Sequence, residues 1–206
     1  MTASTPLSLE TAAAGVVEMA RHAGNRGWVP ATSGNFSVRM DGRFAAVTAT
    51  GADKANLTPD QVIAAEISGP RHPRASAEAP LHLVRYAADP RIGAISHIHS
   101  MAATVLSRRH EADGHLTLKG WELLKAFAGV TTHEASLHVP IVPNDQDTDR
   151  LAALFEARHD RANPCPGYLI AGHGLYVWGA SVKETLRHMD AFDFLLSAQL
   201  HEESAR

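Results

Sequence analysis

The sequence has very little cysteine, and this scarcity limits both its cross-links and its metal chemistry. Cys165 is the only cysteine among 206 residues. A lone cysteine excludes an internal disulfide framework and is typical of proteins in a reducing compartment. It also excludes the thiolate-rich sites of structural zinc proteins. Any bound metal must therefore depend on histidine, aspartate and glutamate, and we expect a cytoplasmic protein.

Runs of one charge and long apolar runs are also missing. The formal net charge is −3, and no block of basic residues occurs, so nothing indicates binding to nucleic acid or to an anionic membrane. No apolar stretch approaches the roughly 18 residues of a membrane span. Residues 1–6 lack the apolar core of a signal peptide. We therefore expect neither a nucleic acid nor a membrane as a partner.

The remaining composition is that of an ordinary globular protein, with 45% hydrophobic and 20% charged residues. Its length suits one domain over residues 1–206. Helices and short strands alternate, which predicts a layered α/β fold. The proline at position 140 predicts that its strand lies at a sheet edge, and residues 110–116 are expected to form a polar connection. The predicted helices cover 8–26, 77–87, 101–109, 121–127, 145–159 and 182–203, and the predicted strands lie within 31–39, 44–49, 93–99, 137–142, 168–171 and 175–178.

Two histidines two residues apart stand in the apolar stretch 95–100. Alternate side chains of a strand point to the same face, so His97 and His99 are expected to project together. Neutral imidazole is a preferred zinc ligand, and catalytic zinc usually has three protein ligands and one open position. With 13 histidines in the chain, such a pair also arises by chance.

His173 is the best candidate for a third ligand. It lies between two glycines directly after the apolar strand predicted over 168–171, so little backbone bulk restricts its ring. An exposed histidine in a hairpin turn is the alternative. No other histidine pairs at ligand spacing, and a structural or supporting role is expected for His82, His115, His133 and His138.

Two glutamates are candidates for acid/base chemistry. Glu122 lies in the apolar segment 121–127, where poor solvation would raise the pKa of its carboxyl toward the value that a general acid needs. An exposed glutamate paired with Lys119 or Lys125 is equally compatible with that segment. Glu78 falls in the first turn of a predicted helix, where the helix dipole alone favours a negative charge.

Three loops of small residues could hold an oxyanion through backbone amides and hydroxyls: 32–35, 48–51 and the helix start at Ser76. Lys54 could add a positive charge. None of these loops has the pattern of a P-loop or of a dinucleotide-binding turn, which disfavours nucleotides. Each loop by itself is a weak signal, because Gly and Ser are common in turns.

Taken together, these segments resemble the class II aldolase family. The likeness covers about residues 9–200 and is carried by 32–35, 50–51, 75–78, 97–99 and 172–174. It implies one Zn²⁺ per subunit on His97, His99 and His173, which stabilises an enediolate made from a phosphorylated keto sugar. It also implies a three-layer α/β/α domain with a largely antiparallel central sheet, and a homotetramer with sites at subunit boundaries.

The resemblance further implies that the substrate phosphate lies near Asn35, Thr50, Gly51 and Ser76. One departure is Ala77, where sugar aldolases commonly carry a second serine. Segments 118–129, 142–147 and 171–179 are most similar to a branch that dehydrates a phosphorylated thio-sugar in methionine salvage. In that branch the acid/base residue corresponds to Glu122, whereas Glu78 stands where the sugar aldolases place theirs.

The resemblance thus predicts a lyase that acts on a small phosphorylated thio-sugar, whose methylthio group Trp121 or Tyr176 would shelter. Two alternatives stay open. One is a class II sugar-phosphate aldolase or epimerase, which shares the metal and the enediolate. The other is a catalytically silent family member that serves as an interaction module, although the retention of the three histidines and of Glu122 argues against it.

Overall fold

The computed structural model describes residues 6–160, 162–163 and 165–205. Residues 1–5, which belong to the segment predicted not to be a signal peptide, lie outside the described residues. The described chain forms an eight-stranded mixed sheet in the order β3-β2-β1-β4-β8-β7-β6-β5, with five α-helices. The strands are β1 (Asn35–Arg39), β2 (Phe44–Thr48), β3 (Val62–Glu66), β4 (Ala94–Ile98), β5 (His115–Lys119), β6 (Ser136–Val142), β7 (Gly167–Ile170) and β8 (Gly174–Gly179). The helices are α1 (Leu9–Asn25), α2 (Ala79–Ala88), α3 (Met101–Arg109), α4 (Thr148–Arg158) and α5 (Val182–Ser204).

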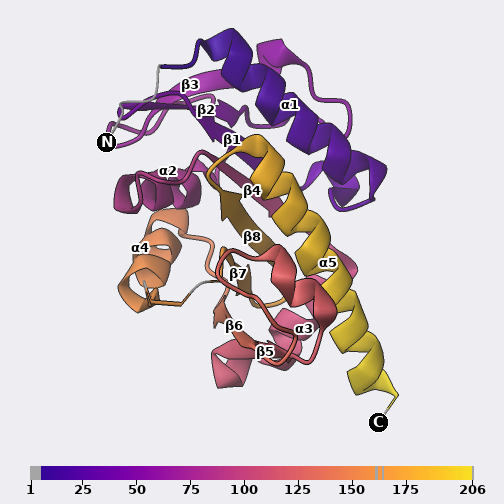
Figure 1. Cartoon of the computed structure of the whole chain (residues 1–206). Coiled ribbons are helices and arrows are strands. Elements are labelled where there is room, and N and C mark those ends of the chain that lie inside the picture. The colour runs from indigo at the N-terminus through magenta and orange to yellow at the C-terminus, as the bar shows by residue number, and fades with distance from the viewer. Residues whose placement is uncertain (1–5, 161, 164, 206) are drawn as a thin grey trace.

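The elements form three layers, as Figure 1 shows. Helices α1, α3 and α5 cover one face of the sheet, and α2 and α4 cover the other. Each face has its own core of buried apolar side chains. All strand pairs are antiparallel except β6 with β7. The prediction of a three-layer α/β/α fold with a largely antiparallel sheet is therefore confirmed. Within the described residues, no helix combines the length and apolar composition needed to cross a membrane.

The central strands β4 and β8 explain why the fold suits a site at their ends. All five residues of β4 are buried, and so are all six of β8. The two strands lie side by side in the middle of the sheet and are covered on both faces. Side chains at the end of β4 and in the β7–β8 turn are therefore carried on its buried central strands.

The helix predicted over 121–127 is wrong. Strand β5 occupies 115–119, Gly120 follows in a left-handed conformation at φ 83°, and Glu122–Ala126 forms only a 3₁₀-helix. Leu124 and Phe127 are both buried, and their spacing of three matches the 3₁₀ period as well as it matches an α-helix. The polar connection predicted over 110–116 is correct for residues 110–114, which join α3 to β5, and extends two residues too far, because β5 begins at His115.

The edge position predicted for the strand with Pro140 is also wrong. Strand β6 lies between β5 and β7. Its register with β7 begins at Ile141, one residue after the proline, whereas Pro140 is paired with His115 of β5. An interior strand tolerates proline here because the residue lies outside the segment paired on both sides.

Candidate metal centre and its acid/base group

The first two histidines come from β4 and the residue after it. His97 is fully buried within β4, and His99 follows the strand, where its backbone N–H donates to the carbonyl of Trp28 at 2.8 Å. Their Nε2 atoms lie 2.8 Å apart. The structure thus confirms that the two rings face the same space, as the strand alternation predicts.

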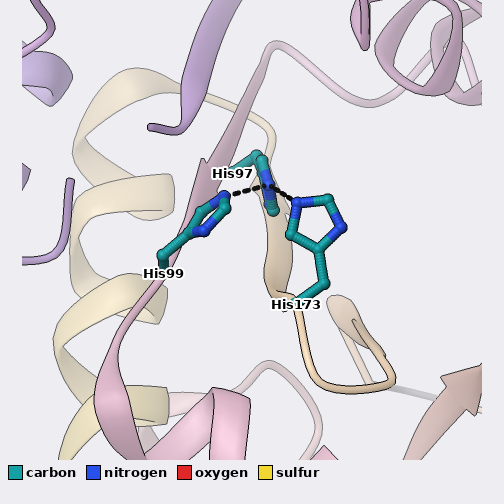
Figure 2. Close-up of side chains that lie close together, drawn as sticks. All are labelled: His97, His99 and His173. Atoms are coloured by element: carbon teal, nitrogen blue, oxygen red, sulfur yellow. Dashed lines mark hydrogen bonds between the residues drawn. The ribbon is translucent and has the colours of Figure 1, made fainter. Parts of the chain in front are cut away.

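His173 approaches this pair from the turn between β7 and β8. Its Nε2 lies 3.3 Å from Nε2 of His97, and Figure 2 shows the three rings converging. The flanking glycines make this possible. Gly172 has φ 64°, and a Cβ on Gly174 would lie 2.3 Å from the carbonyl oxygen of Ile98 and 3.1 Å from Cε1 of His97. Only glycine lets this turn approach the end of β4 so closely.

The three imidazoles are neutral and so can donate lone pairs. Burial lowers the pKa of His97 well below its ordinary value, and burial together with His173 lowers the pKa of His99 to about 4. Burial also lowers the pKa of His173. Nδ1 of His97 lies 3.1 Å from the carbonyl oxygen of Leu175. Since a carbonyl can only accept, Nδ1 carries the proton, and Nε2 presents its lone pair to the other two rings.

The orientation of the His97 ring is set by an aromatic stack. Tyr176 of β8 is buried and stacks on His97 at 4.1 Å between ring centroids and 13° between planes. Tyr168 of β7 stacks beneath Tyr176 at 5.0 Å. Trp121 donates from its indole to Gln199 of α5. Because Tyr176 is buried beneath the ring of His97, it cannot shelter a substrate group. The expectation that Tyr176 shelters the methylthio group is therefore wrong.

Glu78 lies directly against this cluster. Its Oε1 is 3.2 Å from Nε2 of His173, and its Oε2 is 3.5 Å from Nε2 of His97. The side-chain amide of Asn35 donates to Oε2 at 2.6 Å. Burial raises the pKa of the Glu78 carboxyl, although the hydrogen bond from Asn35 and the charge of Lys54 oppose this. Glu78 precedes the first residue of α2, so the first-turn position predicted for it is wrong by one residue.

A cation suits this arrangement. All three rings are neutral, their nitrogens lie within 4.8 Å of one another, and a partly buried carboxylate faces them without a protonated imidazole to neutralise it. Lone pairs and a carboxylate that converge in a partly buried space are stabilised by a divalent ion, and imidazole nitrogens are typical ligands of zinc. The residues present therefore fit the metal that the family resemblance implies.

Glu122 is not in this cluster. Its side chain is 71% exposed, forms an ion pair with Lys125 and lies 3.8 Å from Nδ1 of His133. The hydrogen bond from Lys125 lowers the pKa of the Glu122 carboxyl. The apolar surroundings and raised pKa expected for Glu122 are therefore wrong within this chain, and the alternative of an exposed glutamate paired with Lys125 describes its contacts.

The loops predicted to hold phosphate are tied together close to Glu78. The N–H of Thr50 donates to the carbonyl of Arg74 at 2.9 Å, and the N–H of Ser76 donates to that of Thr48 at 3.0 Å. Thr50, Gly51 and Arg74 line a cavity of 220 Å³. Ser76 does not cap α2, since that helix begins only at Ala79. Its Oγ instead accepts from the N–H of Glu78 at 3.4 Å.

Lys54 and Asn35 occupy the buried side of these loops. Lys54 is 5% exposed and donates to the carbonyl of Ala52 at 2.7 Å. Burial lowers the pKa of Lys54, and the nearby charge of Glu78 opposes this shift. Asn35 pairs in register with His97 across β1 and β4, which brings the amide to Glu78. The contact between Asn35 and Glu78 was not foreseen, because it depends on a strand register that no local pattern encodes.

The comparisons with known proteins agree with this geometry. Residues 14–200 match the family described as the class II aldolase and adducin N-terminal domain. A protein of Parvibaculum lavamentivorans named methylthioribulose-1-phosphate dehydratase is 73% identical over 97% of this chain and 98% of its own. One of the same name from a Bradyrhizobium strain is 49% identical over 92% of this chain and 90% of its own. The crystal structure of L-fuculose-1-phosphate aldolase from Thermus thermophilus superposes with a TM-score of 0.74 at 23% identity, over 92% of this chain and 94% of that one.

Proposed function

Because the chain belongs to the class II aldolase and adducin family, we propose that it dehydrates 5-methylthioribulose 1-phosphate to 2,3-diketo-5-methylthiopentyl 1-phosphate. Relatives that carry the corresponding dehydratase name match it over nearly the whole chain, which supports a carbon–oxygen lyase of methionine salvage. The observation that carries the proposal is the contact of a partly buried glutamate, Glu78, with two of three converging neutral histidines. That arrangement can hold a substrate's oxygens and move a proton beside them.

His97, His99 and His173 would hold one divalent cation per subunit, and we propose Zn²⁺. Three neutral imidazoles leave room for substrate oxygens, as in catalytic zinc sites. When bound, such a cation supplies Lewis-acid polarisation of the substrate ketone. The chain itself fixes the ring of His97, through the carbonyl of Leu175 on one side and the ring of Tyr176 on the other.

Glu78 would serve as an acid/base group at the reacting carbons, since it contacts two of the three histidines. Dehydration requires removal of the C3 proton and protonation of the C4 hydroxyl, which leaves as water, and the resulting enol then becomes the diketone. The carboxylate of Glu78 is suited to take the C3 proton, because burial raises its pKa toward the working range of a general base. Asn35 holds one of its oxygens and so orients the other.

Glu122 keeps the role that its match to the dehydratase branch predicts, as donor of the proton to the C4 hydroxyl. Its contacts within one chain are with Lys125 and His133, so it would have to act in the site of another subunit. We therefore also propose the homotetramer with sites at subunit boundaries that the resemblance implies. Light scattering of the purified protein measures that subunit number directly.

The substrate phosphate would bind at the loops that contain Asn35, Thr50, Gly51 and Ser76, with Lys54 behind them. Backbone amides and hydroxyls of such loops suit a phosphate. Lys54 is buried and held by the carbonyl of Ala52, so we expect it to contribute through its charge. Asn35 is shared between the loops and Glu78, which links the phosphate end of the substrate to the acid/base group.

Product analysis tests the proposal. Purified protein loaded with Zn²⁺ is incubated with 5-methylthioribulose 1-phosphate, and the products are identified by mass spectrometry. The expected product is the diketone phosphate, formed with loss of one water and no change in carbon count. Dihydroxyacetone phosphate, formed from this or any ketose 1-phosphate with a higher kcat/KM, would establish a sugar-phosphate aldolase instead. A protein that binds the metal and turns over neither substrate class would support the interaction-module alternative.

A further inference from the structure

A cavity of 640 Å³ opens beside the histidines. His99 and His173 form one part of its wall. Asn144 and Gln146, which precede α4, form a polar part, and Pro30 and Met101 contribute apolar surface. None of the residues assigned to the phosphate, Asn35, Thr50, Gly51 and Ser76, lines it. A substrate held by its phosphate in those loops and by its oxygens at the histidines would have this cavity available for its other end.

Met101 lines this cavity from the start of α3. It is the first residue of α3, directly after the helix cap Ser100, whose Oγ accepts from the N–H of Ala103 at 3.4 Å. The next two residues, Ala102 and Ala103, are buried against the core. The Met101 side chain is 76% exposed, the largest exposed fraction among the large hydrophobic side chains of the described residues.

The chemistry of methionine suits a thioether ligand. Its side chain is flexible, apolar and polarisable, so it fills irregular gaps against another soft group. A methylthio group seated between Met101 and Pro30 would remove apolar surface of both partners from water. The two aromatic residues first expected to shelter this group do not line the cavity, since Tyr176 is buried under His97 and Trp121 bonds to α5.

We propose that Met101, together with Pro30, forms the binding subsite for the methylthio tail and sets the preference of the enzyme for a thioether at C5. This inference rests on the proposed function, because it assumes that the substrate carries such a tail. It assigns specificity to one exposed side chain that takes no part in holding the metal or moving a proton.

The test compares two substrates across Met101 variants. The substrates are 5-methylthioribulose 1-phosphate and its 5-deoxy analogue, in which hydrogen replaces the methylthio group. In the wild-type enzyme kcat/KM should favour the methylthio substrate, and Met101→Ala should reduce that preference about tenfold, the usual scale for losing a few apolar atoms from a pocket. Met101→Gln, similar in size but polar, should reduce it to a similar degree, whereas Met101→Leu should retain most of it. Val84→Ala, which removes apolar surface from an exposed residue of α2 outside the cavity, is the matched control.

The outcomes separate this inference from the proposed function. If the wild-type enzyme dehydrates neither substrate, the proposed function fails. If it dehydrates both with equal kcat/KM, or if Met101→Ala and Met101→Gln keep the wild-type preference, the function stands and the subsite is refuted. Bound metal, measured for every variant by atomic absorption, should equal the wild-type content, since Met101 is not among the three residues that could hold the ion.

Discussion

Replacing Gly174 by alanine tests whether the close approach of the β7–β8 turn to β4 is what assembles the three histidines. The added Cβ would lie 2.3 Å from the carbonyl oxygen of Ile98 and 3.1 Å from Cε1 of His97. Non-bonded carbon atoms pack best at about 3.5–4.0 Å, so β8 must move away from β4 by about 1 Å. The neighbour that must yield is backbone in a fully buried strand, so the strain cannot be relieved by a rotamer change.

Two magnitudes follow from this displacement. Forcing extra volume into a well-packed interior costs about 1–3 kcal/mol of unfolding free energy. Disturbing the groups that support a metal ligand lowers metal affinity by about 10–100-fold. Zinc affinity would be measured by competition with a chromogenic chelator, and unfolding free energy by urea denaturation of the metal-free protein.

Gly42→Ala provides the matched control. Gly42 has open space where its Cβ would stand and no left-handed φ, so zinc affinity should stay at the wild-type value and stability should change by no more than about 0.5 kcal/mol. Wild-type zinc affinity in Gly174→Ala would refute the reasoning, because it would show that the turn can retreat without separating His173 from His97.

Three further predictions concern the same site and its surroundings. His173→Ala should abolish stoichiometric zinc binding while circular dichroism stays close to that of the wild type, and metal retained at one ion per chain would show that His173 is not a ligand. Glu78→Gln should bind metal and substrate and lose about 10²–10⁴ in kcat, and if only Glu122→Gln shows this loss, the acid/base role belongs to Glu122. Burial lowers the pKa of His82 to about 3, so between pH 6.5 and 3 the unfolded chain binds a proton that the folded chain does not. The unfolding free energy should therefore fall as the pH is lowered through this window, by up to about 1.4 kcal/mol per pH unit from His82. His82→Gln should show a shallower dependence of unfolding free energy on pH, and an unchanged slope would contradict the lowered pKa of His82.

The three converging histidines could be found from sequence because their placement depends on short-range rules. Alternation along a strand puts His97 and His99 on one face, and paired glycines around His173 indicate a turn that needs close approach. The same alternation applies to β5, where Leu116 and Leu118 are buried and their neighbours are exposed. The start of this strand was nevertheless predicted as part of a polar connection, because it begins with a histidine.

Other features of the site could not be read from sequence, because they depend on long-range register. Glu78 reaches His173 only through the packing of the β3–α2 connection against the ends of β4 and β8, and Asn35 reaches Glu78 through the pairing of β1 with β4. Glu122 illustrates the opposite error. Apolar neighbours in sequence suggested a buried carboxyl, whereas Leu124 and Phe127 turn inward and Glu122 stays in solvent beside Lys125.

The convergence of His97 and His173 has a consequence for how the chain is held together. These residues are 76 positions apart, and an ion bound by both would close a loop of that length, acting as a removable cross-link between β4 and the β7–β8 turn. A ligand that binds only the folded chain stabilises it by about 4 kcal/mol when its free concentration is 1,000 times its Kd, which is comparable to a disulfide over a loop of this size. In a protein with a single cysteine, zinc supply would then set thermal stability as well as activity, and chelation should lower the melting temperature under conditions where no substrate is present.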